Sequence, residues 1–207
     1  MANKSKEKLE LLVTPIGTAV YPYLTKPDTQ FDPDGEFKVG LVLSGSDANS
    51  VMATIDKAMA GALEKAKSEN PSKAKKIKAA NPPYTEVTDE DGNETGEIKF
   101  NFKMKAKITT KDGTVINQRP GIFDAAGQPM MNASIGGGTK MKVSAELVPY
   151  FTDLVGAGIT LRLKAVQVIE LVEYTGKTAD RFGFKAEEGY RVSETNSTEV
   201  NDDEADF

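Results

Sequence analysis

The sequence predicts a mainly β fold with inserted helices, an α+β arrangement, and three observations lead to this. Apolar and polar residues alternate in several segments, as they do in strands with one buried face. Asp-Gly pairs at 34–35, 91–92 and 112–113 mark turns between such segments. The one long helical pattern lies between two strand patterns, so it is expected to be an insertion on a β core.

The N-terminal elements follow in chain order. Residues 9–24 have the composition of a strand, but prolines interrupt this region, and proline cannot donate to a ladder. We therefore expect an edge strand or a bulged one. After the turn at 32–35, apolar residues alternate with polar ones over 37–43, which predicts a second strand.

The helical insertion is expected over about 47–80. Apolar residues recur at spacings of three and four from Val51 to Ala66, which predicts a helix over about 47–68. The lysine-rich run that follows Asn70-Pro71 predicts a second helical piece, and Asn81-Pro82-Pro83 stops it.

The second half returns to strand patterns. Residues 98–108 alternate strictly between apolar and polar side chains. A loop rich in Gly and Pro follows over 118–138, then a strand pattern over about 141–147 and a final long strand over about 159–174. We therefore predict a single domain over 1–191 and a disordered acidic tail over 192–207.

Composition favours a binding protein over an enzyme. The 207 residues contain no Cys, His or Trp. This excludes disulfides, thiol nucleophiles, His-based triads and His-ligated zinc. We expect no catalytic residues, no metal site and no cofactor, although carboxylates alone could still bind a metal ion.

The charge is unevenly distributed. The last 16 residues hold six acids and no base, which leaves 25 acids and 26 bases on residues 1–191. An acidic tail therefore follows a nearly neutral body. The N-terminus lacks the apolar core of a signal peptide, and no apolar segment has the length of a membrane span, so we expect a cytoplasmic protein with no membrane partner.

The strand over 98–108 carries the strongest local signal for function. One face would be apolar, and the other would present an asparagine and lysines about 6–7 Å apart, close to the phosphate repeat of an extended nucleic-acid strand. Lysines placed in this way repel one another, so an anionic partner is expected. A solvated lysine face that discourages edge pairing explains the pattern equally well.

Further bases and aromatic residues extend this signal. Residues 98–142 contain eight bases against two acids. A basic groove with aromatic platforms holds single strands without reading their sequence. The candidate nucleic-acid-binding residues are Lys99, Lys103, Lys105, Lys107, Lys111, Arg119, Lys140, Lys142, Tyr21, Tyr23, Phe123 and Tyr150. Any one of these aromatic residues is more often a half-buried member of an ordinary β core.

The acidic tail is a second candidate site. A solubilising end is the commoner meaning of such a tail. Its last residue, however, supplies an aromatic ring together with a free carboxylate, which a pocket with apolar walls and a basic rim could bind. The acids could also enter the protein's own basic groove and compete with DNA there. The candidate partner-binding residues are Asp202, Asp203, Glu204, Asp206 and Phe207.

The second half of the chain resembles the single-stranded DNA-binding proteins of tailed bacteriophages. The resemblance rests on Arg119, Pro120 and Asp124 in the loop, on the glycines at 136–138, on the strand over 163–168, and on the acidic tail that ends in an aromatic residue. It covers residues 98–175 and the tail.

This resemblance implies an OB-fold, a five-stranded and partly open Greek-key barrel with a helix inserted between strands. It also implies a sequence-independent single-stranded DNA-binding protein of phage replication and recombination. The tail would recruit a replicative DNA polymerase, a helicase–primase or a nuclease, and a homodimer is compatible with this role.

Two other functions fit the sequence less well. A virion structural or assembly protein could also be Cys-free, β-rich and acidic-tailed. A magnesium-dependent nuclease needs converging acids, and the spacing of Asp28, Asp32, Asp34 and Asp124 selects no cluster.

Overall fold

Strands make up most of the regular structure. The computed structural model describes residues 9–131, 134–174, 183, 185 and 187–189, and a compact unit ends at Tyr174. Its elements are β1 (Leu11–Val13), β2 (Gly17–Asp28), β3 (Glu36–Ser44), α1 (Gly45–Glu69), the 3₁₀ turn η1 (Ala74–Lys76), β4 (Tyr84–Thr88), β5 (Glu94–Lys105), β6 (Lys107–Thr109), β7 (Val115–Asn117), β8 (Gly121–Phe123), β9 (Lys140–Thr152) and β10 (Gly156–Glu170). The predicted boundary at 191 and the tail over 192–207 lie outside the described residues and stay predictions.

Five of the strands form a closed ring. β2 pairs antiparallel with β3, β3 with β5, β9 with β10 and β2 with β9, whereas β5 and β10 pair in parallel. The barrel strands, counted along the chain, therefore follow the order 1-2-3-5-4-1. This is the Greek-key topology of an OB-fold, so the expected five-stranded barrel is confirmed.

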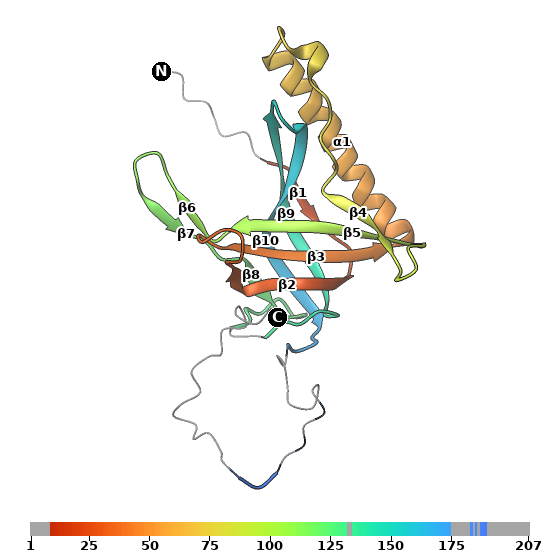
Figure 1. Cartoon of the computed structure of the whole chain (residues 1–207), viewed down its shortest axis with the longest axis vertical. Helices are drawn as coiled ribbons and strands as arrows, with labels where there is room; N and C mark the ends of the chain where they lie inside the picture. Colours follow the sequence, from red (N-terminus) through yellow and green to blue (C-terminus); the bar gives the residue numbers. More distant parts are fainter. Residues whose placement is uncertain (1–8, 132–133, 175–182, 184, 186, 190–207) are drawn as a thin grey trace. The chain divides into compact units, whose positions relative to one another are not determined.

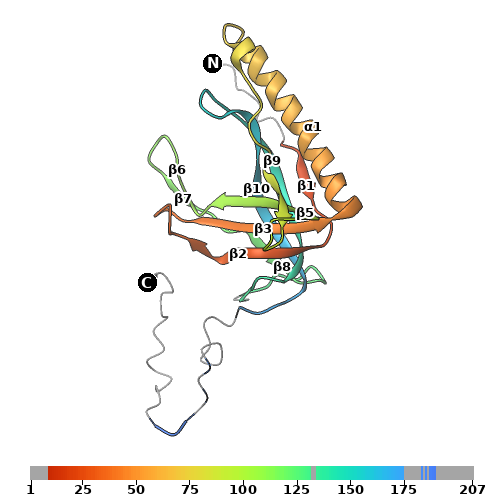
Figure 2. The same cartoon turned by 45° about the vertical axis from the view of Figure 1, so that its right-hand side comes forward.

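The barrel is closed by short seams. The β2–β9 seam has two registered pairs, and so does the parallel β5–β10 seam. Three further strands extend the sheet, because β1 pairs with β9, β4 with β5, and β8 with β10. Figures 1 and 2 show β2, β3 and β5 running side by side, with β9 and β10 crossing them steeply and the β6–β7 hairpin projecting away from the barrel.

Alternation along the strands builds the core, as predicted. In β3, Phe37, Val39, Leu41 and Leu43 are buried, and the residues between them face outward. In β5, the apolar residues from Ile98 to Met104 are buried in the same way. One face of the β2–β3–β5 layer therefore points into the barrel, and the other is left for function.

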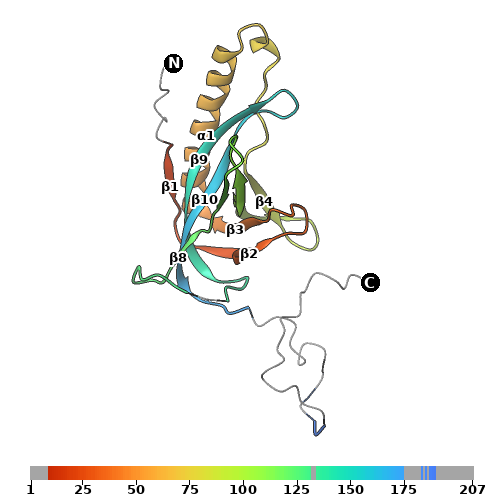
Figure 3. The same ribbon diagram turned by 90° about the vertical axis from the view of Figure 1, so that its left-hand side faces the viewer.

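Helix α1 is the predicted insertion; it follows β3 directly, and η1 and β4 lie between it and β5. It buries one residue every third or fourth position from Ala48 to Ala66, which confirms the predicted apolar face. These residues pack mainly against β9 and β10, where Figure 3 shows the helix lying along the strands. No helix in the described ranges is long and apolar enough to cross a bilayer.

The second helical piece was predicted wrongly. The lysine-rich run over 72–80 forms only the single turn η1, and the chain then becomes extended. Ile77 and Ala80 are buried, and Ala79 makes a β-bridge with Ala157 of β10. Packing against β10 decides the conformation here, because so short a helix gains little by itself.

The strand predicted over 98–108 begins and ends earlier than expected. β5 ends at Lys105, because the Ala106 N–H donates to the Gly35 carbonyl and the Ala106 carbonyl accepts the Gln118 N–H. The chain then enters the β6–β7 hairpin, where Ile108 is 40% exposed rather than buried. The last predicted strand also ends early, at Glu170.

The strand expected over 9–24 is divided around Pro15 into β1 and β2, and β2 is bulged, as expected. β2 loses its register with β3 between Val20 and Tyr23, and again between Tyr23 and Asp28. Pro22 lies inside the first irregularity, where no ladder bond is required of it.

Candidate nucleic-acid interface

The outer face of β2, β3 and β5 carries a groove of about 410 Å³. These are the first three strands of the barrel, and OB-folds bind oligonucleotides and oligosaccharides on the face of the second and third. The polar residues and tyrosines that line it are Tyr21, Tyr23, Asp28, Gln30, Glu36, Lys38, Lys99, Asn101 and Lys103.

The middle of the groove lies over three paired residues, one from each strand. Val20, Gly40 and Asn101 are aligned across the three strands. Gly40 has no side chain, and a Cβ there would lie 3.3 Å from Cδ of Lys99 and from the Val20 carbonyl oxygen. The hollow in the middle of the sheet therefore depends on this glycine.

A bulge in β2 supplies the aromatic edge. Tyr21 has a φ of 49°, a left-handed conformation that is rare for an aromatic residue, and its side chain is 78% exposed. Tyr23 is 41% exposed, and the Lys38 ammonium lies 5.0 Å from the centre of its ring. The irregular backbone turns both rings of the predicted pair onto the groove.

Lys38 is held over Tyr23 by a buried acid. Its ammonium donates a hydrogen bond to the Asp28 carboxylate, which also accepts the Gln30 N–H at 2.9 Å. Asp28 is only 9% exposed. The hydrogen bond from Lys38, followed by that from Gln30, holds the pKa of Asp28 below its usual value. This acid therefore stays charged and fixes the position of the ammonium.

Three bases form a row that crosses the barrel. Lys38 of β3 is in register with Lys103 of β5, which is in register with Arg162 of β10. The Arg162 guanidinium hydrogen-bonds to Glu146, and this contact lowers the pKa of Glu146. The row is basic, but carboxylates hold its members in place.

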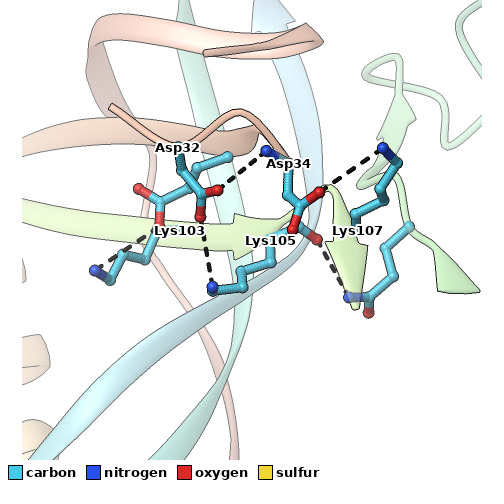
Figure 4. Close-up of polar contacts among 7 residues, drawn as sticks. Asp32, Asp34, Lys103, Lys105 and Lys107 are labelled. Atoms are coloured by element: carbon cyan, nitrogen blue, oxygen red, sulfur yellow. Dashed lines mark hydrogen bonds and ion pairs between the residues drawn. The ribbon is translucent and has the colours of Figure 1, made fainter. Parts of the chain in front are cut away.

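The lysines of residues 98–108 share one side of the protein, but three of them have acidic partners. Figure 4 shows Lys103, Lys105 and Lys107 beside the β2–β3 turn. Their Nζ atoms lie 3.8 Å from Glu36, 3.4 Å from Asp32 and 3.7 Å from Asp34, respectively. The argument that these lysines repel one another unless an outside anion is present is therefore wrong, because the chain supplies the anions itself.

Lys99 differs from the other three lysines. Within the described ranges, no ion pair is found for it, and it lines the groove opposite the aromatic edge. Lys140 belongs to the same row of registered residues, Lys140–Thr18–Val42–Lys99, and its ammonium donates to the Thr18 hydroxyl at 2.7 Å. The predicted bases of β5 and β9 thus share this outer face.

None of the other predicted residues lines the groove, and this includes Lys105, Lys107 and Lys140. Lys111 lies at the tip of the β6–β7 hairpin and Arg119 in the loop after it, and both are exposed. Lys142 faces outward from β9, and Phe123 is half-buried on β8. Tyr150 packs over Gly158, where an added Cβ would lie 2.8 Å from the tyrosine hydroxyl oxygen and 2.9 Å from ring atom Cζ, so this ring has a structural contact elsewhere.

Sequence reasoning missed several residues of this face, among them Asp28, Gln30 and Glu36. Lys38 and Gly40 are outward positions of the predicted strand over 37–43, and the alternation that singled out the β5 lysines would also have found them. Phe31 is 85% exposed in the β2–β3 turn, beside Gln30 of the groove. An aromatic residue next to an Asp-Pro-Asp-Gly turn was the available signal.

The barrel and its groove define the chain as an OB-fold protein with an open basic and aromatic face. A family model described as "Single-stranded DNA-binding protein, Bacteriophage T7" matches residues 16–171. The chain therefore belongs to this family of phage single-stranded DNA-binding proteins, as its resemblance indicated.

Individual relatives agree with this assignment. The chain is 31% identical to a single-stranded DNA-binding protein of Enterobacteria phage T3 over 231 aligned residues, which cover 97% of this chain and 98% of that one. It is 30% identical to the corresponding protein of Escherichia phage T7 over 202 residues, which cover 89% and 86% of the two chains.

Solved structures show the same fold. The crystal structure of gp2.5, a single-stranded DNA-binding protein encoded by bacteriophage T7, matches with a TM-score of 0.69 and 28% identity over 90% of this chain and all of that one. The single-stranded DNA-binding protein of bacteriophage Enc34, in complex with single-stranded DNA, matches with a TM-score of 0.56 at 16% identity, over 80% and 89% of the two chains. The second match supports the fold alone.

Proposed function

We propose that this chain binds single-stranded DNA, without sequence preference and without catalysis, in the groove on β2, β3 and β5. The observation that supports this most directly is a groove that joins exposed tyrosines to lysines on the ligand-binding face of an OB-fold. Cations that follow the backbone and rings that stack on bases suit every base equally.

Each part of the groove has a role in this proposal. The bases stack on Tyr21 and Tyr23, and Phe31 offers a further ring beside the groove. Lys99 and Lys103 neutralise phosphates, while Asn101 lies between them on the same strand face. Gly40 leaves room for the strand to approach the sheet.

We further propose that the protein acts in phage DNA replication and recombination in the host cytoplasm. The acidic tail, with Asp202, Asp203, Glu204, Asp206 and Phe207, recruits a polymerase, helicase–primase or nuclease and competes with DNA for the groove. The support is the charge of the tail, since these residues lie outside the described part of the chain.

A nuclease finds no support in the acids that are described. Asp32 and Asp34 do lie near each other, but each faces a lysine rather than an open site. The described residues also contain no group of three or more His, Cys, Asp or Glu side chains suited to a metal ion.

Fluorescence anisotropy tests the proposal. Labelled oligonucleotides of equal length, single- or double-stranded, are titrated with the full chain over a salt series. We expect a clear preference for single strands of any sequence, and a slope of log affinity against log salt of about −3, the value for four or five phosphate contacts. Equal binding of duplex, or magnesium-dependent loss of the labelled strand, would contradict it.

A further inference from the structure

We propose that the β2–β3 turn (residues 29–35), together with Glu36 at the start of β3, is a resident competitor of DNA. Their carboxylates pair with the ammonium groups of Lys103, Lys105 and Lys107, where phosphates would bind, and a strand that follows the whole lysine row has to displace them. This inference rests on the proposed function, because it concerns the regulation of the same groove.

The two sets of charges match in number and in spacing. Lys103 and Lys105 face outward from β5, about 6–7 Å apart, and Lys107 follows at the start of β6, after a bend at Ala106. The acids Asp32, Asp34 and Glu36 also recur at every second residue, and each faces a different lysine at 3.4–3.8 Å. Three anions that each pair with a successive lysine in this way resemble a short stretch of sugar–phosphate chain.

Hydrogen bonds hold the turn in this position, but its tip is exposed and can move. The Asp34 N–H donates to the Asp32 carboxylate at 3.0 Å, and Gly35 closes the turn through the Asp32 carbonyl at 2.8 Å. The Ala106 N–H ties Gly35 to the end of β5. Residues 29–31, 33 and 34 are exposed, so little packing opposes movement of the tip.

The ion pairs themselves are also exposed. The side chains of Lys105 and Asp32 are 62% and 38% exposed, and those of Lys107 and Asp34 are 48% and 55% exposed. Ion pairs in contact with solvent are weak, so a phosphate can replace a carboxylate at small cost.

The acids lie where DNA phosphates would bind, so carboxylate and phosphate compete for the same lysines. Glu36 lines the groove beside Lys103, whereas Asp32 and Asp34 extend the acids along the lysine row beyond it. A DNA phosphate at any of these lysines would meet a carboxylate of like charge. The turn therefore relieves lysine repulsion in the free protein and weakens binding of short or weakly charged anions, while a long strand wins through many contacts.

Neutral, isosteric substitution tests this. The triple variant Asp32→Asn, Asp34→Asn, Glu36→Gln is compared with Glu86→Gln, Glu90→Gln, Glu94→Gln, which removes the same charge at the opposite end of β5. We expect the turn variant to bind oligo(dT) about tenfold more tightly at low salt, and the control to gain less than about threefold from its general charge. Circular dichroism checks that both variants are folded.

Hydrogen exchange on the unaltered protein provides an independent measurement. Saturation with oligo(dT) should speed exchange at the amides of Asp34 and Gly35, because the turn is released, while it slows exchange in β3 and β5. Equal affinity gains in the two variants, or turn amides that stay protected in the complex, would overturn the inference. If the unaltered protein shows no preference for single strands, the proposed function itself has failed, which is a different result.

Discussion

Tyr21 is the one residue other than glycine with a positive φ among the residues that the structure describes. A bulky side chain in this conformation costs about 1–3 kcal/mol, which the surrounding structure must offset. The ring gains little from burial, since it is 78% exposed. The strain is explained if the ring serves a ligand.

We expect Tyr21→Ala to weaken binding of single-stranded DNA by about 1–3 kcal/mol, because one stacking platform is lost. Tyr150→Ala is the matched control, since that ring packs over Gly158 and lines no part of the groove. It should lower the free energy of unfolding but leave affinity within about twofold. Anisotropy titrations of both variants decide this, and equal losses of affinity would contradict the placement of the site.

Asp28 makes stability depend on pH with a definite sign. Lys38 and Gln30 lower its pKa in the folded protein, so the charged carboxylate stabilises the fold above the unfolded-state pKa near 3.8. That contribution is lost as the pH falls through the lowered folded-state value.

We therefore expect Asp28→Asn to be less stable than the unaltered protein at pH 7, with a difference that shrinks as the pH is lowered below about 4. Urea denaturation at a series of pH values measures both free energies of unfolding. A difference that is independent of pH would show that the ion pair with Lys38 contributes nothing through its charge.

At the scale of elements, β5 supplies both a wall of the core and a line of charges. Its buried residues, with Phe100 fully enclosed, fix which way the lysines point, because inward and outward positions alternate. The β2–β3 turn then determines which of these lysines are already neutralised. Function on this face is thus set by two elements that are far apart in the sequence.

Substitution of Lys99 and Lys103 by Gln tests the contribution of the strand. Loss of two phosphate contacts should lower the steepness of the salt dependence by about 1.4 and weaken binding at low salt. The control, Lys75→Gln with Lys76→Gln, removes the same charge from η1, away from the groove. An unchanged slope in the β5 variant would remove these lysines from the phosphate path.

Local patterns predicted most of the elements. The alternation in β3, the apolar face of α1 and the bulge of the proline-containing β2 depend on neighbouring residues, and all three are confirmed. The prediction of a second helix failed because Ile77 packs against Ala157 of β10 and Ala79 forms a β-bridge with it, and Ala157 is far along the chain. The spacing of apolar residues within a segment does not reveal contacts with distant parts of the chain.

Part of the candidate site could also be predicted from the sequence. Tyr21, Tyr23, Lys99 and Lys103 do lie together on one groove, whereas Phe123 and Tyr150 do not line it. The pairing of Asp32 with Lys105 could not be foreseen, since it joins residues 73 positions apart. The sequence marked 32–35 as a turn, but nothing in it placed the turn beside β5.

For the molecule as a whole, charge is divided between a nearly neutral body and a strongly acidic end. Removal of residues 192–207 would change the net charge from −5 to about +1. If the tail competes for the groove, it adds a second anion to the carboxylates that already face the lysines of β5 and β6.

Deletion of 192–207 is expected to tighten DNA binding at low salt, with little effect at high salt, and to abolish recruitment of replication partners. A chain of full length with the six tail acids replaced by amides separates charge from length and should bind DNA like the deletion. Anisotropy measures affinity, and pull-down with the replicative polymerase measures recruitment. A truncated protein that binds no more tightly would end the competition model.

The closing seams of the barrel have a consequence for synthesis. β2 and β5 are each joined to the ring through β9 or β10, which are the last strands of the barrel to be translated. The ring cannot close until residues up to about 170 have left the ribosome, and these distant pairings make folding slow. Until then the edges of β2 and β5 lack those partners, so aggregation of the nascent chain is a hazard that the topology itself creates.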